Sequence, residues 1–351
     1  MATIAIVFHH FQQDFEIVYD NHINFYYGWF YWGNMVELFF LLSGYFMFRY
    51  IPRILDGEFS LVHWTGKRIK RLLPLAAVSA VCYEILFILY WYVKRVHWIW
   101  NREFTIWGIL LTALGLNEGG AFVNPRVNNI TWYISVLIIC YCVFYVITKL
   151  AQKLRCSPFY CYAFMVLLGV SIITAKIDLP YLNSFTARGY RSFFYGVLLA
   201  KMIHTYGITR KEVLASCAVL GVFAFLAVFR HQMLITGMDN LLCFVVFPAL
   251  VVLFESEIGK KLFCHPVWQL WGNVSYNVYI WHVIGYMFLD LLFYVIGFAP
   301  DLSHVGWMYG YVLLIEAFGV VSHFFIEKPL NSLLEKICDD YRQRRMTRAE
   351  L

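Results

Sequence analysis

Residues 72–93 read LLPLAAVSAVCYEILFILYWYV, a run of 22 residues with a single charged side chain. A helix of about 20 apolar residues can cross the ~30 Å hydrocarbon core of a bilayer, so this run alone favours a transmembrane helix. Ten runs along the chain are apolar enough to be a span or part of one, and we therefore predict an all-α, polytopic integral membrane protein with about ten transmembrane helices. The runs lie at about 1–13, 30–50, 72–93, 131–150, 157–175, 189–203, 212–229, 239–254, 274–298 and 305–327.

The composition of the 351 residues agrees, since 61% are hydrophobic, 20% aromatic and only 14% charged. Such a chain has too little polar surface to cover a water-soluble globule, which excludes soluble enzymes, disordered chains and disulfide-stapled secreted domains. The nine cysteines lie mostly inside apolar runs and form no C-x-x-C pair, so we interpret them as small core hydrophobes. We expect no metal site and no nucleic-acid partner, because the net charge of +6 comes from short basic clusters between spans.

The same basic clusters predict the orientation in the membrane. With the N-terminus inside, 20 of the 28 Lys and Arg residues fall in cytoplasmic loops and tail, and eight fall outside. Cytoplasmic loops carry an excess of Lys and Arg, so both termini are expected in the cytoplasm. We predict a transmembrane domain at 1–330 and a basic cytoplasmic tail at 331–351. The short apolar piece at 104–116 would break this pattern as a span, and we interpret it as interfacial or re-entrant. Polar loops are expected at 51–71 inside and 94–130 outside.

Ionisable side chains inside spans are costly, so each is a functional candidate. His9 and His10 lie in the first span and Glu37 in the second, and the loop between these spans carries no Lys or Arg. An antiparallel hairpin would place His10 and Glu37 at similar depth in the outer half of the bilayer. A carboxylate bonded to an imidazole fixes its tautomer and raises its basicity, as a general base needs. The alternative is that one histidine reaches the interface and Glu37 pairs with another donor.

Two further stretches have both a structural and a functional interpretation. Ser43 and Gly44 form a small-residue notch that allows close helix packing. A group of four cations ends the loop before the third span and either sets orientation or holds a phosphate-bearing donor at the membrane face. These cations are Lys67, Arg68, Lys70 and Arg71, just before Pro74.

In combination these residues resemble acyltransferase family 3, the bacterial inner-membrane O-acyltransferases of surface polysaccharides. The similarity rests on the first-span histidines, on Glu37 followed by FFLLSGY at 39–45, and on the basic stretch before Pro74. Four further matches follow in chain order: WYISV at 132–136, FYG at 194–196, GNVSYNVYIWH at 272–282 and IEKP at 326–329.

The chain also departs from the family pattern. The arginine that usually precedes the first-span histidine would fall before Met1, and Leu137 stands where a glutamate is often found. Residues 1–13 would rise only about 20 Å as a helix, which is short for a span. We therefore expect the natural first span to begin upstream of Met1.

The resemblance implies transfer of an acyl group, most of all acetyl, from cytosolic acyl-CoA to a hydroxyl of an envelope polysaccharide or glycolipid. His10, or His9 as the alternate, would act as base or acyl relay, with Glu37 orienting the imidazole. Arg68, Lys70 and Arg71 would hold the CoA phosphates. Other side chains would line the cavity and donate to a developing oxyanion. These are Ser43, Trp132, Ser135, Tyr276 and His282.

Two other classes of protein fit the hydrophobicity. A transporter or flippase of a lipid-linked sugar or small solute would also need about ten spans, but internal repeats and interrupted helices are typical of transporters, and we find neither in the sequence. A glycan polymerase offers no account of the cations before Pro74.

Overall fold

The computed structural model describes residues 2–20, 24–28, 31–99, 102–229 and 238–337, and within these ranges the chain is helical without a β-strand. The longer helices are α1 (Ala2–Asp14), α2 (Met35–Met47), α4 (Leu61–Lys94), α5 (Ile106–Ala113), α6 (Trp132–Lys153), α7 (Pro158–Ala175), α8 (Ser184–Tyr206), α9 (Arg210–Phe229), α11 (Phe247–Glu255), α13 (Pro266–Val295) and α14 (Gly306–Ser322). The shorter elements are η1 (Trp32–Asn34), η2 (Phe48–Tyr50), α3 (Ile51–Leu55), η3 (Asn129–Thr131), α10 (Met238–Leu241), α12 (Glu257–Phe263) and two π-helical turns, η5 (Leu242–Val246) and η6 (His323–Glu327).

Eight helical segments of the described chain are long and apolar enough to cross a membrane, which confirms an all-α polytopic membrane protein. The predicted first and sixth spans are helices as well, α1 and α8, but they fall outside this set. α1 has 13 residues, and α8 carries Arg188, Arg191 and Lys201 within its length. The count of ten spans, and the cytoplasmic position of both termini, stay predictions.

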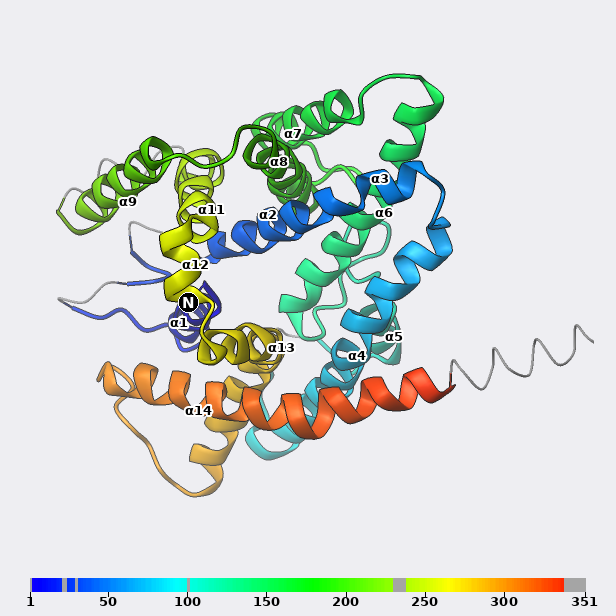
Figure 1. Ribbon diagram of the computed structural model, residues 1–351. Coiled ribbons are helices and arrows are strands. Elements are labelled where there is room, and N and C mark those ends of the chain that lie inside the picture. Colours follow the sequence, from blue (N-terminus) through cyan, green and yellow to red (C-terminus); the bar gives the residue numbers. More distant parts are fainter. Residues whose placement is uncertain (1, 21–23, 29–30, 100–101, 230–237, 338–351) are drawn as a thin grey trace, which may run out of the picture.

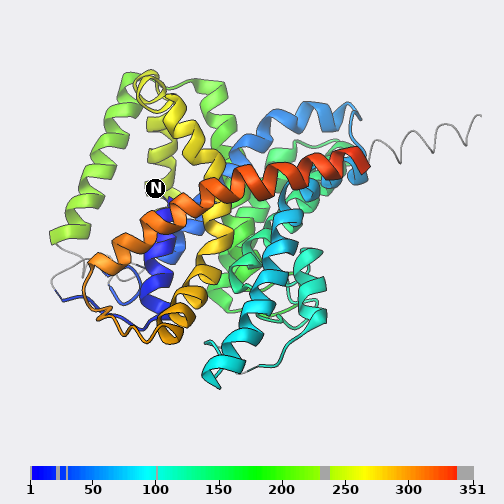
Figure 2. The ribbon, with the colours of Figure 1, turned by 90° about the horizontal axis from the view of Figure 1, so that it is seen from below.

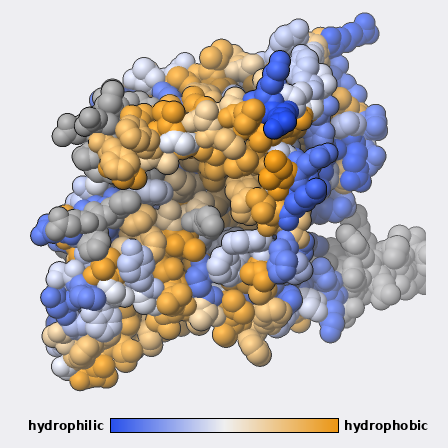
Figure 3. Space-filling model, turned by 60° about the vertical axis from the view of Figure 1, so that its left-hand side comes forward, coloured by the Kyte–Doolittle hydropathy of each residue, from blue (hydrophilic) through white to orange (hydrophobic). Residues whose placement is uncertain are grey.

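The helices form a bundle in which α4 packs against α13 and α2 packs against α8 (Figure 1). α8 begins with a capping box, in which the side chains of Asn183 and Thr186 bond each other's backbone N–H groups. α9 stands at the edge and packs against α11, and only 6% of its most apolar stretch is buried (Figure 2). Hydrophobic residues cover much of the face in Figure 3, as contact with lipid requires.

The prediction of a polar loop at 51–71 was wrong, because most of that segment is helical. α3 follows η2 directly, and α4 begins at Leu61, eleven residues before the predicted span. Ser60 caps α4 by accepting a hydrogen bond from the His63 N–H, and the following Lys and Arg residues have high helix propensity. The basic stretch therefore lies on a helix, which fixes the direction of each cation.

The interpretation of 104–116 as too short for a span agrees with the structure. α5 has eight residues, about 12 Å of rise, and its neighbours stay at one end of the bundle. Arg102 pairs with Glu84 of α4, and the Gly119 carbonyl accepts from the N–H of Tyr181 in the α7–α8 connection. In Figure 2 the end of α4 and the α13–α14 turn lie at the bottom, and α3 lies at the top. The predicted outer and inner loops thus lie at opposite ends.

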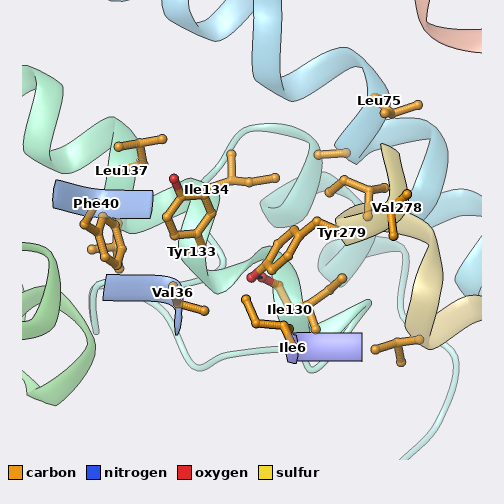
Figure 4. Packing of buried hydrophobic residues seen from close by; sticks show 14 of the residues in the cluster. Ile6, Val36, Phe40, Leu75, Ile130, Tyr133, Ile134, Leu137, Val278 and Tyr279 are labelled. Atoms are coloured by element: carbon orange, nitrogen blue, oxygen red, sulfur yellow. Dashed lines mark hydrogen bonds between the residues drawn. The ribbon is translucent and has the colours of Figure 1, made fainter. Parts of the chain in front are cut away.

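The core between α2, α6 and α13 is aromatic. Figure 4 shows Tyr133 of α6 and Tyr279 of α13 close together beside Phe40 and Ile130, and the two tyrosine ring centroids are 5.7 Å apart. The hydroxyl of Tyr279 donates to the Ile130 carbonyl oxygen at 2.8 Å, which satisfies it inside the bundle. This layer forms the inner wall of the cavity described next.

Candidate active site

A cavity of about 480 Å³ lies where α2, α4, α6 and α13 meet. α2 contributes Phe39, Leu42, Ser43, Phe46 and Met47, which recur at helical spacing on one face. α6 contributes Tyr133, Leu137 and Tyr141, and α13 contributes Gly272, Asn273, Ser275, Tyr276 and Tyr279. Ser43 and Tyr276, which the sequence placed in a cavity, are brought together here. Leu137, the position where the family often has a glutamate, also lines the cavity.

The mouth of the cavity carries a basic rim of Arg49, Lys67, Arg68 and Arg71. At 100° per residue along α4, Lys67, Arg68 and Arg71 share an arc of about 100°, whereas Lys70 points about 60° beyond it. Lys70 accordingly does not line the cavity, and its role in holding the donor stays a prediction. The sequence did not single out Arg49, because it lies on η2, outside the basic run.

Arg68 and Arg71 differ in their surroundings. The Arg68 guanidinium lies 3.4 Å from the centroid of the Trp64 ring and donates to the Trp64 carbonyl oxygen at 3.1 Å. Arg71 is exposed and forms no hydrogen bond or ion pair with any residue that the structure describes. Arg71 is therefore more available to an anionic ligand than Arg68.

One stripe of α13 joins the cavity to the histidines. Ser275, Tyr279 and His282 lie at positions i, i+4 and i+7, so they share a face of the helix. Tyr276 lines the cavity with its ring, but its hydroxyl donates to the Leu72 carbonyl oxygen. The hydroxyls of Tyr276 and Tyr279 thus both donate to backbone carbonyl oxygens of neighbouring elements.

Beyond the inner end of the cavity, α1 and α13 bring His10 and His282 together, with ring centroids 5.2 Å apart. His282 Nδ1 lies 2.7 Å from the Tyr279 carbonyl oxygen, which can only accept, so Nδ1 carries the proton. In the neutral ring, Nε2 is then an acceptor, and this atom is buried without a hydrogen-bond partner among the described residues. His282 therefore presents an unpartnered acceptor nitrogen beside His10.

His9 and His10 have different partners, as their 100° separation on a helix predicts. His10 Nδ1 lies 2.8 Å from Gln13 Oε1. His9 is 1% exposed, and its Nδ1 donates to the Phe25 carbonyl oxygen at 2.8 Å. Neither histidine lines the cavity, whose inner wall ends at Thr3, Phe39 and Tyr279.

The predicted pairing of Glu37 with His10 was wrong. The Glu37 carboxylate accepts two hydrogen bonds from Arg188 of α8, Nε to Oε1 at 2.7 Å and Nη2 to Oε2 at 3.0 Å, and a third from Arg191 at 3.4 Å. Glu37 is on the α2 face that packs on α8, so its carboxylate pairs with two arginines that are always charged. The planar fork of N–H groups in a guanidinium matches the two oxygens of a carboxylate. Arg188 also donates to the Gly33 carbonyl oxygen, beside His9.

The two remaining candidates lie outside the cavity. The Trp132 ring packs under Arg188, with the guanidinium 4.9 Å from its centroid. Ser135 is fully buried and bonds to Asn117, which in turn bonds Thr131. Trp132 therefore supports the Glu37 pair, and Ser135 belongs to a network that ties the outer segment to α6.

Sequence reasoning missed several polar residues that the fold brings to these sites. Arg191 lies inside the predicted span at 189–203 and satisfied the same rule that selected Glu37, and Arg188 lies one residue before that span. Glu327, which lines the cavity, was noted only as part of the IEKP stretch. Among the described residues, no group of three or more His, Cys, Asp or Glu side chains could hold a metal ion.

A bundle of apolar helices, a cavity with a basic rim and buried basic imidazoles beyond it define an integral membrane protein equipped to hold an anionic ligand. The family model described as an acyltransferase domain matches residues 1–322. The chain therefore belongs to acyltransferase family 3, and the resemblance seen in the sequence is confirmed. This membership favours a membrane acyltransferase over the transporter and polymerase alternatives. No curated protein or solved structure matches the chain.

Proposed function

We propose that this membrane acyltransferase is an O-acyltransferase of the bacterial inner membrane. It takes an acyl group, with acetyl as the expected one, from cytosolic acyl-CoA and transfers it to a hydroxyl of an envelope polysaccharide or glycolipid. The observation that carries this proposal is the cavity of about 480 Å³ with its basic rim on the predicted cytoplasmic side. CoA combines a phosphate-bearing head with a long uncharged arm, and a basic rim above a deep, largely apolar cavity is complementary to both.

The histidines supply the proton chemistry of this reaction. His10 takes the proton of the acceptor hydroxyl through Nε2 while the hydroxyl oxygen attacks the thioester carbonyl carbon. The new C–O bond forms, the C–S bond breaks, and CoA leaves as a thiolate that recovers the proton from the imidazolium. Gln13 holds His10 through Nδ1, and His282 offers a second Nε2 beside it. Glu37 acts on this site through Arg188, as a positioning residue.

The donor site is tested by acyl-CoA binding to the purified chain in lipid nanodiscs. Charge-assisted bonds to phosphate contribute roughly 1.5 to 3 kcal/mol each, so Arg71→Ala should weaken acetyl-CoA binding about tenfold or more. Lys70→Ala removes the same charge from the same helix turn but off the cavity, and its effect should be much smaller. Equal losses in both variants would mean that the cations act only through the general potential of the membrane face.

The reaction itself is tested by transfer of radiolabelled acetyl from acetyl-CoA to envelope glycan in membranes that contain the chain. Label should appear in the glycan and be released by mild base, as an O-ester requires. If the label stays in acetyl-CoA and the glycan is unmodified, the proposed acceptor is contradicted.

A further inference from the structure

Glu327 places a carboxylate on the wall of a cavity whose rim is basic. We propose that Glu327 is a specificity-determining residue of the donor site, and that its carboxylate accepts an amide N–H from the pantetheine arm of acyl-CoA. The proposal rests on the proposed function, because it assumes that acyl-CoA occupies the cavity.

The carboxylate is held by two donors. Asn277 Nδ2 donates to Glu327 Oε2 at 2.8 Å, and His323 Nδ1 lies 2.6 Å from the same oxygen. Oε1 has no hydrogen-bond partner among the residues that the structure describes. The Glu327 side chain is 14% exposed and lines the cavity, so a free acceptor is kept in a mostly buried position on the cavity wall.

The orientation of the Asn277 amide is fixed by the next members of the network. Ser322 Oγ donates to Asn277 Oδ1 at 2.8 Å, and the Trp281 Nε1–H donates to Ser322 Oγ at 2.7 Å. An indole N–H can only donate, so Trp281 fixes the donor and the acceptor of each following hydrogen bond in this network. Asn277 must then donate to Glu327, and this hydrogen bond holds the carboxylate in one orientation.

The backbone at this position is unusual. Residues His323–Glu327 form a π-helical turn, in which the Lys328 N–H bonds the His323 carbonyl oxygen. Such turns are rare in proteins, and those that occur often lie at functional sites. Pro329 follows two residues later and cannot donate to the carbonyl of Phe325, which a regular helix would need. The wide turn places His323 and Glu327 side by side.

The position of Glu327 between the rim and the inner wall of the cavity determines which part of the ligand it contacts. Its tether, Asn277, lies between Asn273 near the rim and Tyr279 at the inner wall, a helix rise of about 9 Å. A CoA with its phosphates at the basic rim runs its arm past this level, where amide N–H groups match a carboxylate acceptor. The negative charge also repels phosphate, so it favours one orientation of the ligand and disfavours deep entry of free nucleotides.

The test separates the arm of the ligand from its head. Binding of CoA and of 3′-phosphoadenosine 5′-diphosphate, the head without the arm, is measured by calorimetry on the full chain in nanodiscs. Glu327→Gln turns an amide N–H toward the cavity, because the carbonyl oxygen stays with Asn277 and His323. We expect about tenfold weaker CoA binding with unchanged binding of the nucleotide head. Glu335→Gln, at an exposed position further along the same helix, is the matched control and should bind both as the parent does.

The outcomes distinguish this proposal from the proposed function. If the parent chain binds neither ligand, the proposed donor is wrong. If the parent binds CoA and Glu327→Gln binds it equally, or loses both ligands equally, the role of Glu327 is wrong. CoA analogues with each arm amide replaced in turn by an ester test the same contact without any variant. One analogue should bind the parent about tenfold more weakly, and equal affinity for all of them would overturn the proposal.

Discussion

Each of the three clustered histidines has a hydrogen bond at Nδ1, which leaves Nε2 as the reactive atom. This tautomer is imposed on His9 and His282 by backbone carbonyl oxygens and favoured in His10 by a glutamine amide. At the scale of the residue, the site therefore has basic nitrogens that are already oriented. Among the described residues no carboxylate bonds any of these rings, and in the neutral ring Nε2 is the nitrogen that can accept a proton.

If His10 and His282 act as one unit, His10→Ala and His282→Ala should each slow acetyl transfer by at least ~100-fold, in line with general-base contributions. The double variant should be little slower than either single one, since residues of one unit lose their effect together. Acetyl transfer in membranes is the measurement, and acetyl-CoA binding should be unchanged. His304→Ala, in the exposed α13–α14 turn, is the control. Full activity in both single variants would exclude the histidine mechanism.

Glu37 differs from the histidines because its main role is electrostatic. It is 2% exposed and balances Arg188 and Arg191, of which Arg191 is 1% exposed. Glu37→Gln would remove the carboxylate that pairs with both guanidinium groups in a low-dielectric interior. Breaking a buried ion pair in this way costs roughly 3 to 5 kcal/mol.

We therefore expect Glu37→Gln to lower the midpoint of thermal unfolding in detergent. Glu58→Gln is the matched control, because Glu58 and Arg53 form a pair at 2.6 Å whose side chains are about half exposed. Exposed pairs contribute about 0 to 1 kcal/mol, so the control should unfold close to the parent. A Glu37→Gln variant as stable as the control would show that the arginines find other partners.

At the scale of the helix, the contact between α2 and α8 decides which face of α2 lines the cavity. A Cβ added at Gly44 would lie 1.8 Å from the Phe193 carbonyl oxygen, and one at Gly196 would lie 2.0 Å from that of Leu41. The two glycines let the backbones touch, as small residues do at membrane helix contacts. Gly44 thus serves packing, while its neighbour Ser43 faces the cavity.

Gly196→Ala should force these two helices apart and destabilise the fold by about 1 to 3 kcal/mol, the usual cost of overpacking. Gly310→Ala in α14 is the control, because nothing lies within 4 Å of the added Cβ. Alanine is favoured over glycine in a helix by about 1 kcal/mol, so the control should unfold at the parent temperature or above. The readout is the thermal unfolding midpoint of each variant. A stable Gly196→Ala variant would contradict the close approach.

At the scale of the whole molecule, the ends of the bundle differ in what they carry. The basic rim, α3 and the start of α4 lie at one end, while Arg102, α5 and the α13–α14 turn lie at the other. This polarity agrees with the excess of Lys and Arg predicted for the cytoplasm. A donor that enters through the rim would come from the cytoplasm, and the acceptor would approach from the opposite side.

Labelling with a membrane-impermeant maleimide tests this orientation. The exposed native Cys156 and Cys264 should react only in inverted vesicles. Val96→Cys and Val123→Cys, at positions 52% and 91% exposed, should react in intact cells. Labelling of these two introduced cysteines from opposite faces would make 104–116 a true span and overturn the ten-span topology.

The sequence by itself determined the class of the protein and most of its helices. Length and apolarity of a run are properties of contiguous residues, and lipid imposes the same requirement on every span. The predicted span at 157–175 is α7, and that at 212–229 lies within α9. Local motifs also identified Ser43, Tyr276 and the three rim cations of α4, because each lies in a short run of sequence that can be interpreted without knowledge of the neighbouring helices.

Only the tertiary structure decided which side chains meet. His10 and Glu37 were placed at the same depth from their positions in the chain, but depth leaves the direction around the helix open. The packing of α2 on α8 turned Glu37 toward Arg188, and the packing of α1 on α13 turned His10 toward His282. Partners separated by more than 150 residues depend on helix neighbours and rotations that no local pattern specifies, and these contacts assembled the site.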